Sequence, residues 1–320
     1  MLAATLLSNA IIRQPPLAQA DHCSNMDPQQ PNQVTVAPRC STEDAPVDYF
    51  AEGSFVKQEL LGTGERGEVF AARCGRQRYA LKIIPVPVAN PEPQMFPVFL
   101  PDVSIEADVQ EEFAHPNILR CVDARYSDDG SNFHLFSELA RCGDIERVVK
   151  RFGFVERHTA RRFFFQIVDG LRAIHSKNYA HRDIKPSNIL VFGKNSVKIG
   201  DLGSAKPKAR YSDLVYKLGA HGYYIPPEML YANTYYADGV AWDLYGAAMV
   251  YIYMLLGKHP WDLTNRCDPE YDAFCRGKLE ELIAIDSRWE RARKDFWFVR
   301  RLLHHDPLKR ILPLRYFGGM

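Results

Sequence analysis

The hydrophobic pattern of the chain changes near Gly143, and this change constrains the fold more than any other feature. Before it, short runs rich in β-forming residues alternate with turn residues such as Gly75. After it, long segments carry apolar residues at helical spacing. This order predicts an α+β protein with a β-rich first lobe (about 49–139), a hinge (about 138–143) and a mainly helical second lobe (about 144–320).

The expected elements can be assigned to residue ranges. The first lobe is predicted to hold a small sheet and one long helix, which His115-Pro116-Asn117 ends. The predicted strands are 55–61, 68–73, 78–84, 118–126 and 132–139, with short strands near 189–199 in the second lobe. The predicted helices are 104–114 in the first lobe and 144–151, 158–177, 238–256, 272–284 and 295–304 in the second.

The first 48 residues differ from the rest in composition. All 38 Phe, Trp and Tyr lie from Tyr49 onward, while the leading segment holds six Pro and five Gln. Such a segment cannot bury enough apolar surface to offset its ordering entropy. We therefore expect residues 1–48 to be a disordered leader before a domain at 49–320. A signal peptide is the alternative, because Ala18-Gln19-Ala20 resembles a cleavage site, but no Lys or Arg precedes Arg13.

Composition and charge exclude several classes of protein. The chain has 320 residues, of which 46% are apolar and 25% charged, and these fractions exclude whole-chain disorder and a fibrous repeat. A net charge of +1 leaves no large field for non-specific binding to nucleic acid or anionic membrane. The longest apolar run, 244–256, is too short to cross a bilayer. We therefore expect neither nucleic-acid binding nor a membrane span.

Cysteine usage bears on the cellular compartment. The seven cysteines are odd in number and show no Cys-x-x-Cys spacing, which argues against a disulfide framework and against a zinc site. A reducing compartment is expected, with the cytoplasm first and the nucleus as the alternative.

A glycine-rich segment, Gly62-Thr63-Gly64-Glu65-Arg66-Gly67-Glu68-Val69, lies between the first two expected strands. Glycines let the backbone approach phosphate oxygens closely and point N–H groups at them. A dinucleotide-binding turn has a similar pattern, but it needs a helix to begin at the third glycine. Because strand-forming residues follow Gly67, we favour a hairpin that covers phosphates.

Lys82 is a charged residue within an otherwise apolar strand. If its side chain points inward, it needs an anionic partner. Glu106 on the predicted helix offers one, and Glu111 and Glu112 are competitors on the same helix. The alternative is an edge-strand lysine that faces water.

The densest group of polar residues lies in Tyr179-Ala180-His181-Arg182-Asp183-Ile184-Lys185-Pro186-Ser187-Asn188-Ile189-Leu190. Asp183, Lys185 and Asn188 lie there between apolar flanks, and Gly200-Asp201-Leu202-Gly203 follows downstream. Two carboxylates and an amide on loops are suited to holding Mg²⁺, which prefers oxygen ligands and substrate phosphates.

In this order and spacing, the motifs resemble those of eukaryotic-type protein kinases over about residues 55–316. Pro226-Pro227-Glu228 and Arg310 extend the match, and a lysine two residues after Asp183 is typical of the Ser/Thr branch. The resemblance implies a two-lobed kinase fold, with a small β-rich N-lobe containing one long helix and a larger helical C-lobe. It also implies transfer of the γ-phosphoryl group of MgATP to Ser or Thr hydroxyls of protein substrates.

The resemblance further implies a role for each motif residue. Asp183 would accept or orient the proton of the attacking hydroxyl, and Lys185 would neutralise charge on the transferring phosphoryl group. Asn188 and Asp201 would bind Mg²⁺. Lys82, held by Glu106, would contact the α- and β-phosphates of ATP. The residues implied to contact the nucleotide are Gly62, Gly64, Gly67, Val69, Ala80, Lys82, Glu106, Glu138 and Ala140.

The segment 201–228 resembles an activation segment, which an ion pair between Glu228 and Arg310 would anchor. In the family, an arginine at the position of Arg182 often pairs with a phosphate on this segment. Ser212 is the favoured acceptor, and an upstream kinase is therefore one candidate partner. An unmodified exposed loop is the alternative. The other candidate acceptors are Tyr211, Tyr216 and Ser204.

Three departures from the family pattern are the most serious. His221 stands where a Thr is usual, and Gln110 stands where the family has an apolar residue. Ala241 falls where the long buried helix usually begins with Asp, with Asp243 as a candidate substitute. Two functions therefore remain: an active kinase, or a pseudokinase scaffold that binds nucleotide or partners with little catalysis. The intact phosphate and metal residues favour the active enzyme.

Overall fold

The structure is a computed structural model, and it describes residues 55–64, 66–86, 104–207, 222–231, 238–262 and 264–310. Four sequence predictions lie outside these residues: the leader at 1–48, the candidate phosphate acceptors in 208–221, the departure at His221 and the end of the domain beyond Arg310.

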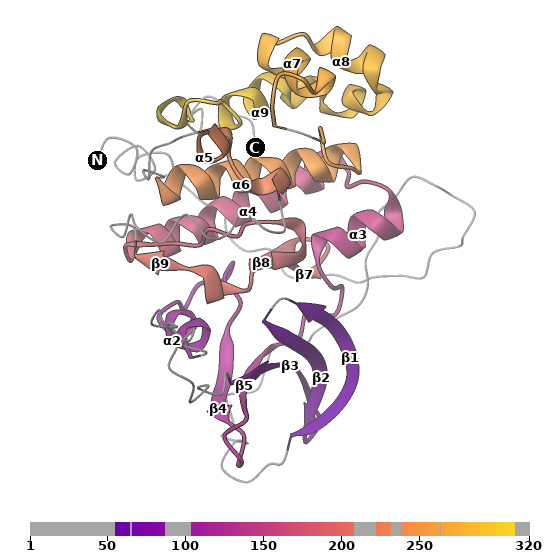
Figure 1. The fold of residues 1–320 in the computed structure, drawn as a ribbon. Coiled ribbons are helices and arrows are strands. Elements are labelled where there is room, and N and C mark those ends of the chain that lie inside the picture. The colour runs from indigo at the N-terminus through magenta and orange to yellow at the C-terminus, as the bar shows by residue number, and fades with distance from the viewer. Residues whose placement is uncertain are drawn as a thin grey trace, which may run out of the picture.

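A five-stranded antiparallel sheet forms the small lobe, below the helical lobe in Figure 1. Its strand order is β1-β2-β3-β5-β4. The glycine-rich segment joins β1 to β2 with Gly64 opposite Gly67, so the predicted hairpin is confirmed and the dinucleotide-binding turn is excluded. The strands are β1 (Val56–Gly64), β2 (Gly67–Cys74), β3 (Gln77–Pro85), β4 (Cys121–Tyr126) and β5 (Asn132–Glu138).

The predicted helix of the small lobe is present, but α2 (Ile105–Glu111) has only seven residues and is shorter than the predicted range 104–114. Its last turn contains no basic residue, while Glu111 and Glu112 place negative charge at the negative end of the helix dipole. The chain then leaves the helix, and Phe113 packs into the core of the large lobe. This contact joins α2 to the lobe that carries the polar motifs.

Helices dominate the large lobe, as predicted, and two short two-stranded sheets face the small lobe (Figure 1). The helices are α3 (Ile145–Phe152), α4 (Arg157–Ser176), α5 (Pro227–Tyr231), α6 (Gly239–Leu256), α7 (Pro269–Arg276), α8 (Leu279–Ile285) and α9 (Phe296–Leu302). The short strands are β6 (Tyr179–Ala180) paired with β9 (Lys206–Pro207), and β7 (Ile189–Gly193) paired with β8 (Ser196–Ile199). The two-lobed α+β fold is thus confirmed.

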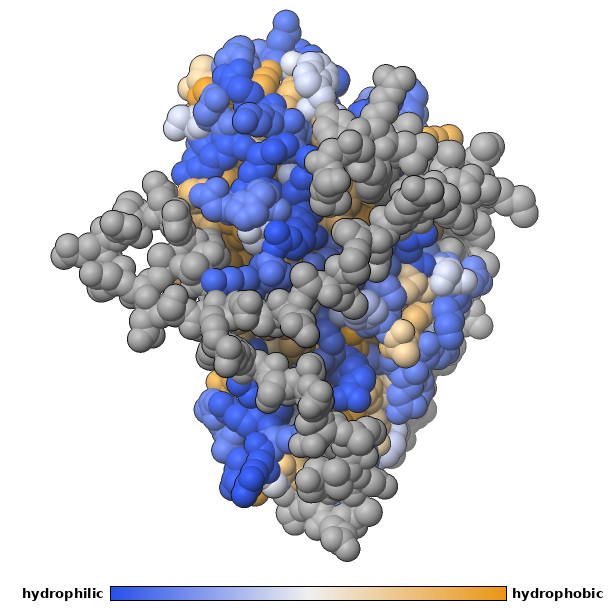
Figure 2. Space-filling view, turned by 180° about the vertical axis from the view of Figure 1, so that it is seen from behind, coloured by the Kyte–Doolittle hydropathy of each residue, from blue (hydrophilic) through white to orange (hydrophobic). Residues whose placement is uncertain are grey.

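The core of the large lobe is built around α6. Asp238 begins this helix by accepting the N–H of Val240 at 2.9 Å, and Gly257 ends it in the left-handed conformation. Of the helices that the structure describes, α6 alone is long and apolar enough to cross a membrane, and 94% of that stretch is buried inside the protein. Figure 2 shows a mostly hydrophilic described surface on the face seen from behind. Helix α6 therefore reads as a core helix.

The predicted helix 272–284 is two helices, α7 and α8, with a break at Gly277. Gly277 has φ +74°, a conformation that L-residues rarely adopt, and its N–H closes the last turn of α7. Asp268 starts α7 by accepting the N–H of Tyr271. Apolar spacing continues across the break, so periodicity alone could not show it.

The predicted ion pair between Glu228 and Arg310 is present and bidentate. The Arg310 side chain is fully buried, and its Nε donates to the carbonyl of His304 at 2.7 Å. Its guanidinium also lies over the ring of Tyr245. The pair ties α5 to the last described residues of the chain.

Candidate active site

At the centre of the site, one lysine contacts two carboxylates, and the three residues come from three different parts of the chain. Lys82 on β3 donates to Glu106 on α2 at 2.6 Å and to Asp201, which follows β8, at 3.0 Å. The Lys82 side chain is 15% exposed and that of Glu106 only 6%, so their ion pair is shielded from water. The inward-pointing reading of Lys82 is therefore confirmed, and Glu106 is its partner on α2.

Charge attraction keeps Lys82 and Asp201 ionised. Burial disfavours the charge on Lys82, but the neighbouring carboxylates outweigh it and raise the pKa of Lys82 above its usual value. Burial likewise opposes the charge on Asp201, yet attraction to Lys82 lowers the pKa of Asp201 to about 2. Burial has the larger effect on Glu106 and raises the pKa of its carboxyl. At neutral pH the site offers a cation to phosphate and an anion to a metal.

A second cluster lies on the loop after β6. Lys185 Nζ donates to Asp183 Oδ2 at 2.9 Å, and Asn188 Nδ2 donates to the same oxygen at 3.0 Å and to the Asp183 carbonyl at 2.8 Å. Asp183 Oδ2 thus accepts one hydrogen bond from Lys185 and one from Asn188. These bonds hold the carboxylate of Asp183 in one orientation.

The two loops are joined through His181, which is fully buried. His181 Nδ1 accepts the N–H of Asp183 at 3.2 Å, so the ring proton resides on Nε2, which lies 3.0 Å from the carbonyl of Gly200. The histidine therefore bridges the Asp183 loop and the residue before Asp201. The sequence reasoning gave His181 no role, although its place two residues before Asp183 was the available signal.

Asp243 occupies the anchoring position that residue counting gave to Ala241. Its carboxylate is fully buried and accepts the backbone N–H of His181 at 2.8 Å and that of Arg182 at 2.7 Å. Oδ2 also lies 2.8 Å from His175 Nε2. The family spacing of 13 residues after Glu228 ends at Ala241, which is two residues before Asp243. The departure at Ala241 is therefore only apparent.

Replacing Asp243 with asparagine is expected to loosen the loop that carries Asp183. An amide has one acceptor oxygen, so a backbone N–H of His181 or Arg182 loses its partner, which costs about 1–3 kcal/mol when the group is buried. Urea denaturation should show this loss in the free energy of unfolding, while the exposed Asp262→Asn serves as the matched control. Equal stability of the two variants would contradict the anchoring role.

Gln110 is a real departure, and the structure shows how it is accommodated. Its side chain is 2% exposed, and Nε2 donates to the carbonyl of Leu119 at 2.6 Å. Among the described residues, Oε1 has no hydrogen-bond partner. Gln110 thus ties α2 to the segment before β4 by a polar contact.

The residues expected to bind a metal suit Mg²⁺. Asn188 uses its NH₂ group toward Asp183, which leaves the amide oxygen for another partner, and Asp201 offers an ionised carboxylate. The described part of the chain has no group of three His, Cys, Asp or Glu residues that could hold a metal. Two oxygen donors, completed by phosphate and water, match the coordination that Mg²⁺ prefers.

The other residues expected to contact nucleotide line the same side of the small lobe. Gly62 and Gly64 end β1, and Val69 on β2 lies opposite Lys82 on β3. Ala80 precedes Lys82 by two residues and therefore faces the same side of the sheet. Gly67 tolerates no side chain, because an added Cβ would lie 2.0 Å from the carbonyl oxygen of Ile83.

The two candidate residues beyond the sheet differ in what they can offer. The carboxylate of Glu138 is already used, since it accepts from Lys198 Nζ at 2.6 Å and from the N–H of Arg120 at 2.9 Å. A side-chain contact of Glu138 with nucleotide is therefore not available in this arrangement. The carbonyl of Ala140 accepts the N–H of Gly143, and no acceptor among the described residues takes the N–H of Ala140.

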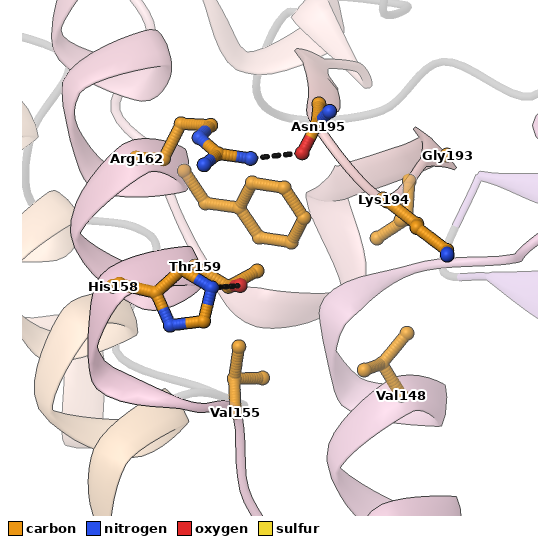
Figure 3. Close-up of a pocket in the computed structure, with 10 residues that line it drawn as sticks. Val148, Val155, His158, Thr159, Arg162, Gly193, Lys194 and Asn195 are labelled. Carbon is orange, nitrogen blue, oxygen red and sulfur yellow. Dashed lines mark hydrogen bonds between the residues drawn. The ribbon is translucent and has the colours of Figure 1, made fainter. Parts of the chain in front are cut away.

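A cavity of about 180 Å³ lies away from these residues, between α3, α4 and the turn from β7 to β8 (Figure 3). Val148, Val155 and Phe163 form an apolar part of its lining, and Arg162 at its edge donates to Asn195. None of the candidate catalytic or metal residues lines this cavity.

Comparison with known proteins covers most of the chain. The family described as protein kinase domain matches residues 55–315. The serine/threonine-protein kinase CHK1 of Mycosarcoma maydis is 34% identical over 183 residues, which are 56% of this chain and 26% of that protein. An Aurora kinase of Dictyostelium discoideum is 30% identical over 260 residues, which are 79% of this chain and 62% of that protein.

A third relative is the serine/threonine-protein kinase GIN4 of Saccharomyces cerevisiae, 29% identical over 271 residues. That match covers 79% of this chain and 22% of the relative. The matches to these three relatives therefore span between 22% and 62% of the relatives' own lengths.

Proposed function

The chain belongs to the protein kinase family, and we propose on this premise that it transfers the γ-phosphoryl group of ATP to Ser or Thr hydroxyls of proteins. The observation that carries the proposal is the sharing of Lys82 by Glu106 and Asp201, at 2.6 and 3.0 Å. This arrangement brings a cation that can bind phosphate next to an ionised carboxylate that can bind a metal. Two of the three relatives are named serine/threonine-protein kinases, which favours Ser and Thr as the residues that accept the phosphoryl group.

The expected cofactor is Mg²⁺, which when bound neutralises charge on the phosphates of ATP. Asn188 and Asp201 would hold it, and Lys82 would bind the α- and β-phosphates. The proposed nucleotide site also includes Gly62, Gly64, Gly67, Val69, Ala80, Glu106 and Ala140, together with the backbone of Glu138.

We assign the proton transfer and the charge neutralisation in the proposed reaction to Asp183 and Lys185. The Asp183 carboxylate would orient the acceptor hydroxyl and take its proton, and the hydroxyl oxygen would then form the new bond to phosphorus as the bond to ADP breaks. Lys185, now 2.9 Å from Asp183 Oδ2, would offset negative charge on the moving phosphoryl group. Catalysis would rest on positioning and electrostatics.

Nothing in the described residues favours the scaffold alternative. The residues that a phosphoryl transferase needs are present, and their side chains contact one another: Lys82 reaches both carboxylates, and Asn188 and Lys185 both reach Asp183. A scaffold that only binds nucleotide does not require the oriented carboxylate of Asp183.

Partners, compartment and domain limits are further proposals. Protein substrates and an upstream kinase acting on the segment within 208–221 follow from the family. We propose a reducing compartment, the cytoplasm or the nucleus, because the seven cysteines are odd in number and show no Cys-x-x-Cys spacing. We place the domain at about 49–320 after a disordered leader at 1–48.

Labelled ATP and a generic basic protein test the activity. We expect acid-stable label on the protein from ATP labelled at the γ-phosphate, no label from ATP labelled at the α-phosphate, and no transfer once EDTA removes Mg²⁺. Labelling from the α-phosphate would indicate nucleotide transfer. No labelling of any protein from γ-labelled ATP, by a folded and ATP-binding chain, would favour the scaffold.

A further inference from the structure

Arg66 lies in the glycine-rich turn between β1 and β2, and its side chain reaches the loop after Asp201. Its Nη2 donates to Ser204 Oγ at 3.4 Å. An added Cβ on Gly203 would lie 2.2 Å from Arg66 Nη1, so the absence of a side chain at Gly203 makes room for the guanidinium. The turn therefore contacts the loop that begins with the proposed metal ligand.

The guanidinium lies among the charged groups of the site. The same Cβ position on Gly203 is 3.2 Å from Glu106 Oε2, so the side chains of Arg66 and Glu106 both lie next to one point beside this glycine. The charge of Arg66 acts on both Glu106 and Asp201. With Lys82, the cluster therefore contains two cations and two anions.

Most hydrogen-bond donors of Arg66 have no acceptor in the part of the chain that the structure describes. A guanidinium carries five N–H donors. Among the described residues, Arg66 makes one hydrogen bond, the long one to Ser204, and no ion pair within 4.0 Å. Lys82, by contrast, is already shared by Glu106 and Asp201. Arg66 is thus a cation of this cluster with several N–H donors that have no matching acceptor among the described residues.

A phosphate group is the acceptor that fits this geometry. A guanidinium binds phosphate oxygens in a bidentate manner, and such charge-assisted hydrogen bonds are stronger than neutral ones. Lys82, whose side chain is 15% exposed, is assigned to the α- and β-phosphates. Arg66 lies at the tip of the turn, beside the loop of Asp201, where the end of the triphosphate chain would lie.

We propose that Arg66 binds the terminal phosphate of the nucleotide and positions it for transfer. The inference rests on the proposed function, since it requires a nucleoside triphosphate in this site. It makes Arg66 a second phosphate-binding cation beside Lys82, carried by the turn between β1 and β2 rather than by a strand.

Calorimetric titration with adenosine, MgADP and MgATP tests the proposal on the full chain. For Arg66→Ala we expect the Kd of MgATP to rise about tenfold, a change of about 1.4 kcal/mol. The Kd of MgADP should rise less, and that of adenosine should stay unchanged. Arg66→Lys should recover part of the lost MgATP affinity, because lysine keeps the positive charge but lacks the planar set of donors that binds phosphate in a bidentate manner. Arg76→Ala, an exposed arginine at the β2–β3 turn, is the matched control.

The contrary results are distinct. Equal changes for adenosine and MgATP in Arg66→Ala would show a structural role and overturn the proposal. Unchanged or tighter MgATP binding would also overturn it, the latter by showing that Arg66 obstructs the site. If the wild type itself binds no MgATP, the proposed function fails as well. If the wild type binds MgATP and transfers phosphate while Arg66→Ala binds MgATP equally well, only this inference fails.

Discussion

Asp183→Asn is expected to lower the rate of phosphoryl transfer by about 10²–10⁴-fold, the range that a positioned general base contributes. The amide keeps the size of the carboxylate but cannot take the proton of the acceptor hydroxyl. Lys185 and Asn188 would still face an oxygen atom, so the loop should keep its shape. The measurement is the rate of label transfer from γ-labelled ATP under saturating MgATP.

The control for this variant is Asp128→Asn, an exposed aspartate in the turn between β4 and β5. It should transfer phosphate at the wild-type rate. The Kd of MgATP should also be unchanged in Asp183→Asn, because Asp183 is assigned to the acceptor and not to the nucleotide. If Asp183→Asn retains more than about a tenth of the wild-type rate, the assignment of Asp183 is wrong.

Lys82→Met is expected to reduce transfer by about a hundredfold or more, which is the cost of removing one preorganised charge from a transition-state site. The methionine fills a similar volume but offers no cation to the phosphates. It also leaves Glu106, whose side chain is 6% exposed, without its partner. Burial already raises the pKa of Glu106. We therefore expect its carboxyl to take up a proton in the variant, so that the lobe stays folded.

Two measurements separate chemistry from folding in this variant. Thermal unfolding should show that Lys82→Met remains folded, and the transfer rate should fall while Lys57→Met, an exposed lysine on β1, keeps full activity. Asp201→Ala should likewise abolish transfer, because Asp201 is assigned to the metal. A folded Lys82→Met protein with more than about a tenth of the wild-type rate would contradict the role of Lys82.

The parts of the fold that depend on local pattern could be predicted from the sequence. Strand-forming residues after Gly67 indicated a hairpin, and β1 and β2 form one. An inward-pointing Lys82 in an apolar strand needs an anion, and Glu106, 24 residues away on the predicted helix, supplies it. In both cases the signal is the pattern of the residues around Gly67 or Lys82.

Predictions that depended on long-range packing were less successful. Counting from Glu228 could not identify Asp243 as the anchor of the catalytic loop, because that role depends on hydrogen bonds to backbone groups more than sixty residues away. The length of α2 was overestimated, since Phe113 follows the apolar spacing of the helix but packs into the other lobe. The contact of Arg66 with Ser204 has no sequence signal at all, because folding alone brings the two loops together.

The most direct test of the central claim is the balance of products in one reaction. ADP released and phosphoserine plus phosphothreonine formed on a protein acceptor should be measured together, after acid hydrolysis of the acceptor. The proposed function predicts one ADP for each phosphorylated Ser or Thr, and neither product with Asp183→Asn. ADP formed without phosphorylated protein, or phosphate found on tyrosine alone, would contradict the proposed transfer to Ser and Thr.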